Sequence, residues 1–188
     1  MNRTLIAAAV ALWLLGACGQ EESAGPTAFE SRYRPLPAEA IILQGATVLT
    51  GNGERLEGAD VAMRDGKIIA VGIDMDVAGF TAIDASGKWI TPGVIDVHSH
   101  LGVYPSPGVN AHSDGNEATD PNTAEVWAEH SVWPQDPGFV AALAGGVTSL
   151  QILPGSANLF GGRGVTLKNV PGQSVMDMKF PGAPHGLK

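Results

Sequence analysis

Two apolar strands with a helix between them constrain the fold of this 188-residue chain more than any other feature of its sequence. Residues 94–98 have apolar side chains on both faces, which is typical of a parallel strand that is covered on both sides. Residues 136–145 predict a helix with a capping aspartate and a proline at its start and two glycines after it, and residues 147–153 predict a second strand. A strand–helix–strand unit joins parallel strands, so the chain after residue 92 is expected to be α/β. A further helix is expected at residues 123–130.

The residues before this unit have a different pattern. Residues 39–91 consist of short strand-like runs separated by turns, and Asp65-Gly66 is a strong hairpin signal because glycine tolerates the positive φ of a tight turn. Five or six short strands in about 50 residues predict a small β-sandwich or barrel.

The first 18 residues have the pattern of an export signal. Arg3 precedes an apolar run of 11 residues, Leu5 to Leu15, and a helix that spans a membrane needs about 20. The sequence Leu15-Gly16-Ala17-Cys18 resembles the lipobox of bacterial lipoproteins, and Cys18 is the only cysteine of the chain. We therefore expect a signal peptide at residues 1–18, lipidation of Cys18, and an exported protein anchored in the membrane facing the periplasm. The small residue after Cys18 favours the outer membrane, and an ordinary signal peptide with a chance cysteine is the alternative.

Composition and net charge limit which further segments, partners and sites this chain can have. Residues 19–38 are rich in Glu, Ser, Gly and Pro and have no apolar periodicity, so they are expected to be a flexible tether. The net charge of −8 disfavours a nucleic-acid partner, since phosphate binding needs a basic surface. A single cysteine excludes a disulfide framework within the chain and a zinc site with several cysteines. The oligomeric state is left open.

Three residues at the end of the first apolar strand point to a metal. Alternate residues of a strand share a face, so Asp96, His98 and His100 are expected to point the same way. The two histidines are about 6.6 Å apart along the strand, and their rings can converge on one ion. The 74 residues from Trp89 to Gly162 contain seven acidic residues and no Lys or Arg, which suits a divalent cation.

The other histidines of this region have simpler explanations. His112 lies in a polar loop and is interpreted as solvated, and His130 is interpreted as a surface or packing residue. The glycine-rich loop 153–164 is either part of a substrate pocket or an ordinary connection.

The segment Pro92-Gly93-Val94-Ile95-Asp96-Val97-His98-Ser99-His100 resembles the first barrel strand of the amidohydrolase superfamily. The run Ala144-Gly145-Gly146-Val147-Thr148-Ser149 resembles the start of the second strand of that family. With the loops at 112–117 and 153–158, the chain is most similar to the imidazolonepropionase-related members, and the similarity extends over about residues 40–188.

The resemblance implies a metal-dependent (β/α)8 barrel preceded by a small β-sandwich domain, of which residues 39–91 are the N-terminal part. In the barrel, one or two divalent ions, most simply Zn²⁺, would activate water for attack on a C–N bond. The resemblance also implies that His98 and His100 are metal ligands and that Asp96 orients a ligand imidazole. Members with two ions add a carboxylated lysine, for which Lys188 is the first candidate and Lys168 the competitor.

The length of the chain departs from this family. A barrel needs roughly 200 residues or more, and 188 − 92 = 96 follow Pro92. We therefore expect residues 92–188 to form the first strands and helices of a truncated, catalytically incomplete barrel, with the catalytic aspartate beyond the C-terminus. The leading hypothesis is a hydrolase acting on a cyclic amide or imidazolone-like small molecule. The alternative is a non-catalytic exported lipoprotein that binds a metal or a solute.

Overall fold

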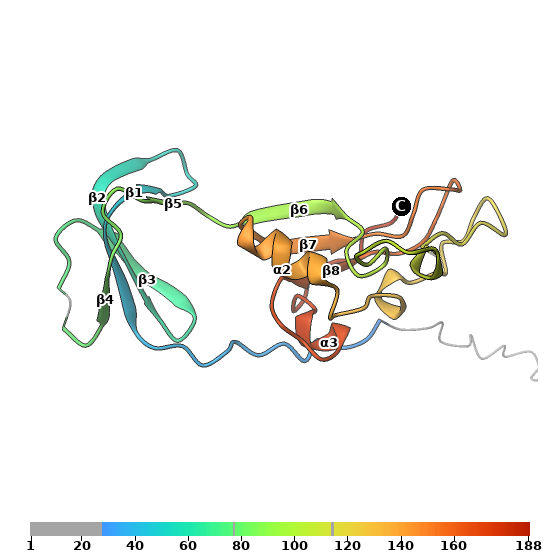
Figure 1. Ribbon diagram of the computed structural model, residues 1–188, viewed down its shortest axis with the longest axis horizontal. Helices are drawn as coiled ribbons and strands as arrows, with labels where there is room; N and C mark the ends of the chain where they lie inside the picture. The colour runs from blue at the N-terminus through green and yellow to red at the C-terminus, as the bar shows by residue number, and fades with distance from the viewer. Residues whose placement is uncertain (1–27, 77, 114) are drawn as a thin grey trace, which may run out of the picture.

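The computed structural model describes residues 28–76, 78–113 and 115–188, and their strands form two sheets (Figure 1). The first sheet contains β1 (Ile41–Leu49), β2 (Arg55–Arg64), β3 (Lys67–Gly72), β4 (Thr81–Asp84) and β5 (Trp89–Ile90). The second part contains β6 (Val94–Ser99), η1 (Asn110–His112), η2 (Ala128–His130), α2 (Pro137–Ala144), β7 (Val147–Ile152), β8 (Val165–Lys168) and α3 (Val175–Met178). Within the described ranges, no helix has the length and hydropathy needed to cross a bilayer.

The first sheet is built around β1. Its order is β3-β2-β1-β4, and β5 pairs with a later part of β1. The hairpin predicted at Asp65-Gly66 is confirmed, and the two residues have φ values of 52° and 70°. The described strands of residues 39–91 form one sheet, because β2, β4 and β5 all pair with the two edges of β1. That this sheet is the N-terminal part of a β-sandwich domain stays a prediction.

The strand–helix–strand unit is confirmed. β6 and β7 are parallel, with Val94 opposite Val147 and Asp96 opposite Leu150. Helix α2 precedes β7, and the buried side chain of Asp136 caps it by accepting a hydrogen bond from the N–H of Gly138 at 2.8 Å. β8 then pairs antiparallel with β7.

Strand β6 is less covered than its sequence predicts. The second sheet has the order β6-β7-β8, so β6 is at its edge and has one partner strand. The side chains of Val94, Ile95 and Val97 are 53%, 67% and 68% exposed. The prediction of a strand covered on both faces is therefore wrong for the described residues, because the core lies on the β7 and β8 side, around Leu150, Ile152 and Leu167.

The helix predicted at residues 123–130 is also wrong. Only the single 3₁₀ turn η2 forms at its end. The N–H of Ala128 donates to the carbonyl of Arg163 at 2.8 Å and not to a carbonyl one helical turn earlier, and the carbonyl of Val126 accepts from the N–H of Arg163 at 2.7 Å. Pairing with a distant segment has replaced the local hydrogen bonds that a helix needs.

Residues 28–34, here called the strap, correct the prediction of a flexible tether over residues 19–38. The strap lies against η2 and α3 before the chain continues to β1 (Figure 1, blue). The N–H of Phe29 donates to Glu129 Oε1 at 2.9 Å, and the N–H of Arg32 donates to the carbonyl of Met176 at 2.8 Å. The signal peptide, Cys18 and the first part of the predicted tether fall outside the described residues.

Candidate metal centre

Two histidines and a lysine converge at the carboxyl end of β6. The Nζ atom of Lys188 lies 2.7 Å from Nε2 of His98 and 3.4 Å from Nε2 of His100. The two imidazole rings are edge to face, with their centroids 5.3 Å apart. Two histidine nitrogens and the nitrogen of a lysine about 90 residues later in the sequence therefore face one small volume.

Backbone pairing brings Lys188 to this place. The last three residues run beside residues 161–164: the N–H of Lys188 donates to the carbonyl of Gly162 at 3.0 Å, and the N–H of Gly164 donates to the carbonyl of Gly186 at 2.7 Å. Residues 161–164 follow the loop that leaves β7, the partner of β6. The lysine is thus held on the same edge of the sheet as the histidines.

The orientation of His100 fixes where its protons lie. Its Nδ1 is 2.8 Å from the carbonyl oxygen of Leu153, and a carbonyl can only accept, so Nδ1 carries the hydrogen and donates it. In the neutral ring, Nε2 then has a free lone pair directed at Lys188 Nζ. A donor bond from the other ring nitrogen to a carbonyl is the usual way in which proteins orient a metal-binding histidine.

These residues fit a divalent metal. Two imidazole Nε2 atoms form a donor set that Zn²⁺ accepts, and carboxylation of Lys188 Nζ would add carboxylate oxygens to it. Within the described residues, no group of three or more His, Cys, Asp or Glu side chains is arranged to hold an ion, so the lysine is needed to complete a three-residue site.

Comparison with known proteins identifies relatives for this arrangement. No family model matches the chain. Amidohydrolase tasK of Hapsidospora irregularis is 44% identical over 90 residues, and the dihydroorotase of Pelotomaculum thermopropionicum is 41% identical over 61 residues. The crystal structure of an amidohydrolase from Thermotoga maritima MSB8 superposes with a TM-score of 0.70 at 39% identity over 76% of this chain. The chain is a relative of the amidohydrolases.

The shared region is a part of each of these amidohydrolases. The tasK match covers 48% of this chain and 9% of the relative, and the dihydroorotase match covers 32% and 14%. The chain covers 37% of the Thermotoga maritima protein.

Among the residues that the structure describes, Asp96 has no hydrogen bond to an imidazole ring. Its carboxylate accepts a hydrogen bond from the backbone N–H of His98 at 3.0 Å, within the same strand. The predicted role passes to the carbonyl of Leu153, which orients His100. The Asp96 side chain turns back along β6 to the N–H of His98, and the carbonyl of Leu153, just after β7, contacts the His100 ring.

The competing lysine lies elsewhere. Lys168 is the last residue of β8, and its ammonium group lies over the rings of Tyr33 and Phe180, 5.1 and 4.4 Å from their centroids. Of the two lysines weighed from the sequence, the structure places Lys188 beside the histidine pair.

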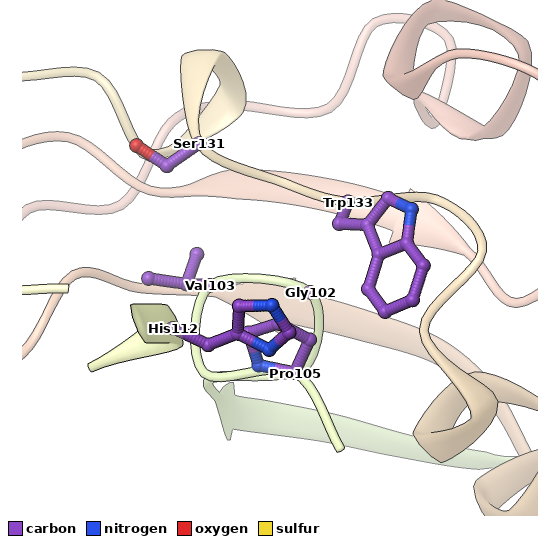
Figure 2. Close-up of a pocket in the computed structure, with 6 residues that line it drawn as sticks. All are labelled: Gly102, Val103, Pro105, His112, Ser131 and Trp133. Carbon is purple, nitrogen blue, oxygen red and sulfur yellow. The ribbon is translucent and has the colours of Figure 1, made fainter. Parts of the chain in front are cut away.

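His112 and His130 lie outside the metal centre. His112 borders an open cavity of about 470 Å³ together with Trp133, and its Nδ1 atom is buried with no hydrogen-bond partner among the described residues (Figure 2). The ring of His112 is therefore half-buried and not simply solvated, as was predicted. The exposed ring of His130 packs beside Phe29 and Trp127. His98, His100 and Lys188 do not line the cavity.

Sequence reasoning missed three groups around His100. They are the carbonyl of Leu153, the ring of Tyr104 at 5.6 Å between centroids, and the amide of Asn116, which contacts the Tyr104 hydroxyl at 2.8 Å. The available signal was the parallel pairing itself, which puts the residues just after β7 beside those just after β6.

Proposed function

We propose that this chain carries the first metal-binding residues of an amidohydrolase that cleaves a C–N bond of a small amide with a metal-activated water. The observation that carries this proposal is the convergence of His98 Nε2, His100 Nε2 and Lys188 Nζ at the carboxyl end of a parallel strand. Active sites of α/β barrels lie at that end of their strands.

Each residue has a defined part in this proposal. His98 and His100 bind a divalent cation, with Zn²⁺ as the expected metal, through their Nε2 lone pairs. Lys188 Nζ adds to CO₂ and loses a proton, which gives a carbamate whose oxygens bind metal. When bound, the ion lowers the pKa of a water molecule to about 7 and so supplies a nucleophile at neutral pH.

The substrate class follows from the relatives. Their names include dihydroorotase, D-hydantoinase and allantoinase, each of which refers to a ring that contains amide C–N bonds. We infer a cyclic amide as the substrate. Hydrolysis adds one water across the bond: the carbonyl side becomes a carboxylate, and the ring nitrogen gains a hydrogen and stays bonded to the rest of the opened ring.

Metal binding with matched lysine variants tests the proposal. We expect the purified chain to bind Zn²⁺ in a calorimeter, and His98→Ala and His100→Ala to weaken binding at least tenfold, because loss of a supporting group alone costs about 10- to 100-fold. With ¹³C-labelled bicarbonate, a carbamate NMR signal should appear in the wild type and in Lys168→Arg, and disappear in Lys188→Arg.

His130→Ala serves as the histidine control, since that ring lies outside the centre. Equal Zn²⁺ affinity in all variants would contradict the proposal. The hydrolysis of hydantoin and dihydroorotate is measured on a protein in which the barrel that begins in this chain is complete. Zn²⁺ binding without hydrolysis by that protein would favour the alternative, a non-catalytic metal-binding lipoprotein.

We also propose that the protein is exported and anchored to the membrane through a lipid on Cys18, facing the periplasm. The support is the apolar run and lipobox-like sequence of residues 5–18.

A further inference from the structure

The glycine-rich loop holds the backbone of Lys188. The N–H groups of Gly161 and Gly162 both donate to the carbonyl oxygen of Lys188, at 2.5 and 3.2 Å. The N–H of Lys188 donates in turn to the carbonyl of Gly162 at 3.0 Å. From this backbone the lysine side chain extends until its Nζ atom lies 2.7 Å from Nε2 of His98. The place of Nζ therefore depends on where the loop lies.

An asparagine of the same loop fixes that position. The side-chain nitrogen of Asn158, Nδ2, lies 2.8 and 3.0 Å from the carbonyl oxygens of Glu117 and Asp120. The hydroxyl oxygen of Thr123 lies 2.7 Å from the same nitrogen. A carbonyl oxygen can only accept, so this atom is the NH₂ group and its hydrogens are directed at residues 117–123. One side chain thus fastens the loop to a segment 35 to 41 residues earlier.

The join between the loop and this segment is tight. The N–H of Thr123 donates to the carbonyl of Phe160 at 2.7 Å. A Cβ atom at Gly161 would lie 2.9 Å from the carbonyl oxygen of Gly155 and 3.1 Å from Asn158 Oδ1, so a side chain there would displace the loop. Asn158 Oδ1 is buried and has no hydrogen-bond partner among the described residues. The side chain of Asn158 is therefore held by its NH₂ group alone.

We propose that Asn158 is a positioning residue for Lys188, whose NH₂ group sets the loop so that Nζ lies beside the two histidines. This inference rests on the proposed function. At Nζ, an N–C bond to CO₂ forms, a C=O π pair moves to oxygen, and one proton passes to water. Asn158 has no described hydrogen bond to His98, His100 or Lys188, so it acts on this reaction only through the loop.

Variants of nearly unchanged shape test this role. Asn158→Asp replaces the NH₂ group with an oxygen that faces two carbonyl oxygens. Asn122→Asp is its matched control, because it makes the same change at an exposed residue and keeps the oxygen that accepts from the N–H of Ala124 at 3.2 Å. Gly161→Ala displaces the loop by another route, and its control is Gly72→Ala, where the nearest atom would be 3.6 Å away.

The test measures two properties of the full chain: the carbamate NMR signal with ¹³C-labelled bicarbonate, and the Zn²⁺ affinity in a calorimeter. We expect Asn158→Asp and Gly161→Ala to lose most of the carbamate signal and to bind Zn²⁺ about 10- to 100-fold more weakly, with both controls at the wild-type level. In a Lys188→Arg background, we expect neither loop variant to weaken Zn²⁺ binding further, because both act through that lysine.

The inference is overturned if Asn158→Asp keeps the wild-type carbamate signal. It is also overturned if the loop variants weaken Zn²⁺ binding equally with and without Lys188→Arg, since a general loosening of the fold would give that result. Urea denaturation shows whether each variant is folded, and Gly161→Ala gives the same comparison if Asn158→Asp is not. A wild type without a carbamate signal contradicts the proposed function itself, and with it this inference, before any loop variant is made.

Discussion

At the scale of single residues, a buried ion pair distinguishes this chain. The side chains of Glu129 and Lys179 are 1% and 8% exposed and contact each other directly. Both side chains also bond to Phe29 of the strap. Glu129 accepts a hydrogen bond from the N–H of Phe29, and Lys179 donates one to the carbonyl of Phe29 at 2.6 Å. Buried charges persist when paired and hydrogen-bonded in this way.

Removal of one partner should therefore be costly. Lys179→Met leaves the Glu129 carboxylate buried without its counter-charge, and we expect the free energy of unfolding to fall by about 3–5 kcal/mol. Urea denaturation measures it. The matched control is Glu57→Gln, which breaks the exposed Arg55–Glu57 pair and should change stability by less than about 1 kcal/mol. Similar losses for the two variants would contradict the special role of the buried pair.

At the scale of elements, the short helix α3 depends on its cap and on the strap. Ser174 and Asp177 form a capping box, in which the N–H of Ser174 donates to Asp177 Oδ2 at 2.9 Å. Arg32 of the strap lies 3.6 Å from Asp177 Oδ1 and donates to Ser174 Oγ at 2.8 Å. A one-turn helix is unstable alone, so these contacts hold it in place.

The cap makes part of the stability depend on pH. Hydrogen bonds from Ser174 hold the pKa of Asp177 below its ordinary value of 3.8, with a smaller contribution from the charge of Arg32. A lowered pKa in the folded state means that the contribution is present above pH about 4 and is lost as the pH falls through the lowered pKa. We expect the wild type to melt at a higher temperature than Asp177→Asn at pH 6, and the difference to close in acid.

Melting curves between pH 2 and 6 check this expectation. Glu39→Gln, at an exposed residue, serves as the control. A difference between wild type and Asp177→Asn that stays constant over the whole pH range would refute the assignment.

At the scale of the whole molecule, both parts of the chain expose apolar side chains to solvent. They include Ile68, Ile69, Ile73 and Ile83 in the first part and Ile95, Val97 and Val140 in the second.

The proposed lipid anchor would affect the location of the whole molecule. Eleven positions separate Cys18 from Phe29, so the span between them is at most about 40 Å for an extended chain, and the strap then fixes the folded part. We expect detergent to be needed to extract the wild type from membranes of a Gram-negative host, and Cys18→Ser to be recovered in the soluble exported fraction. Extraction of the wild type without detergent would refute the lipid anchor.

Local sequence patterns determined the strand–helix–strand unit, the Asp65-Gly66 hairpin and the common end of β6 for His98 and His100. Each of these features depends on backbone and side-chain preferences within a few neighbouring residues, and such preferences can be inferred from the sequence. Tertiary structure decided that Lys188 and not Lys168 lies beside the histidines, that Leu153 orients His100, and that residues 28–34 bind the buried Glu129–Lys179 pair. These outcomes depend on which distant segments of the chain pack against one another. Preferences within a few residues do not determine that choice.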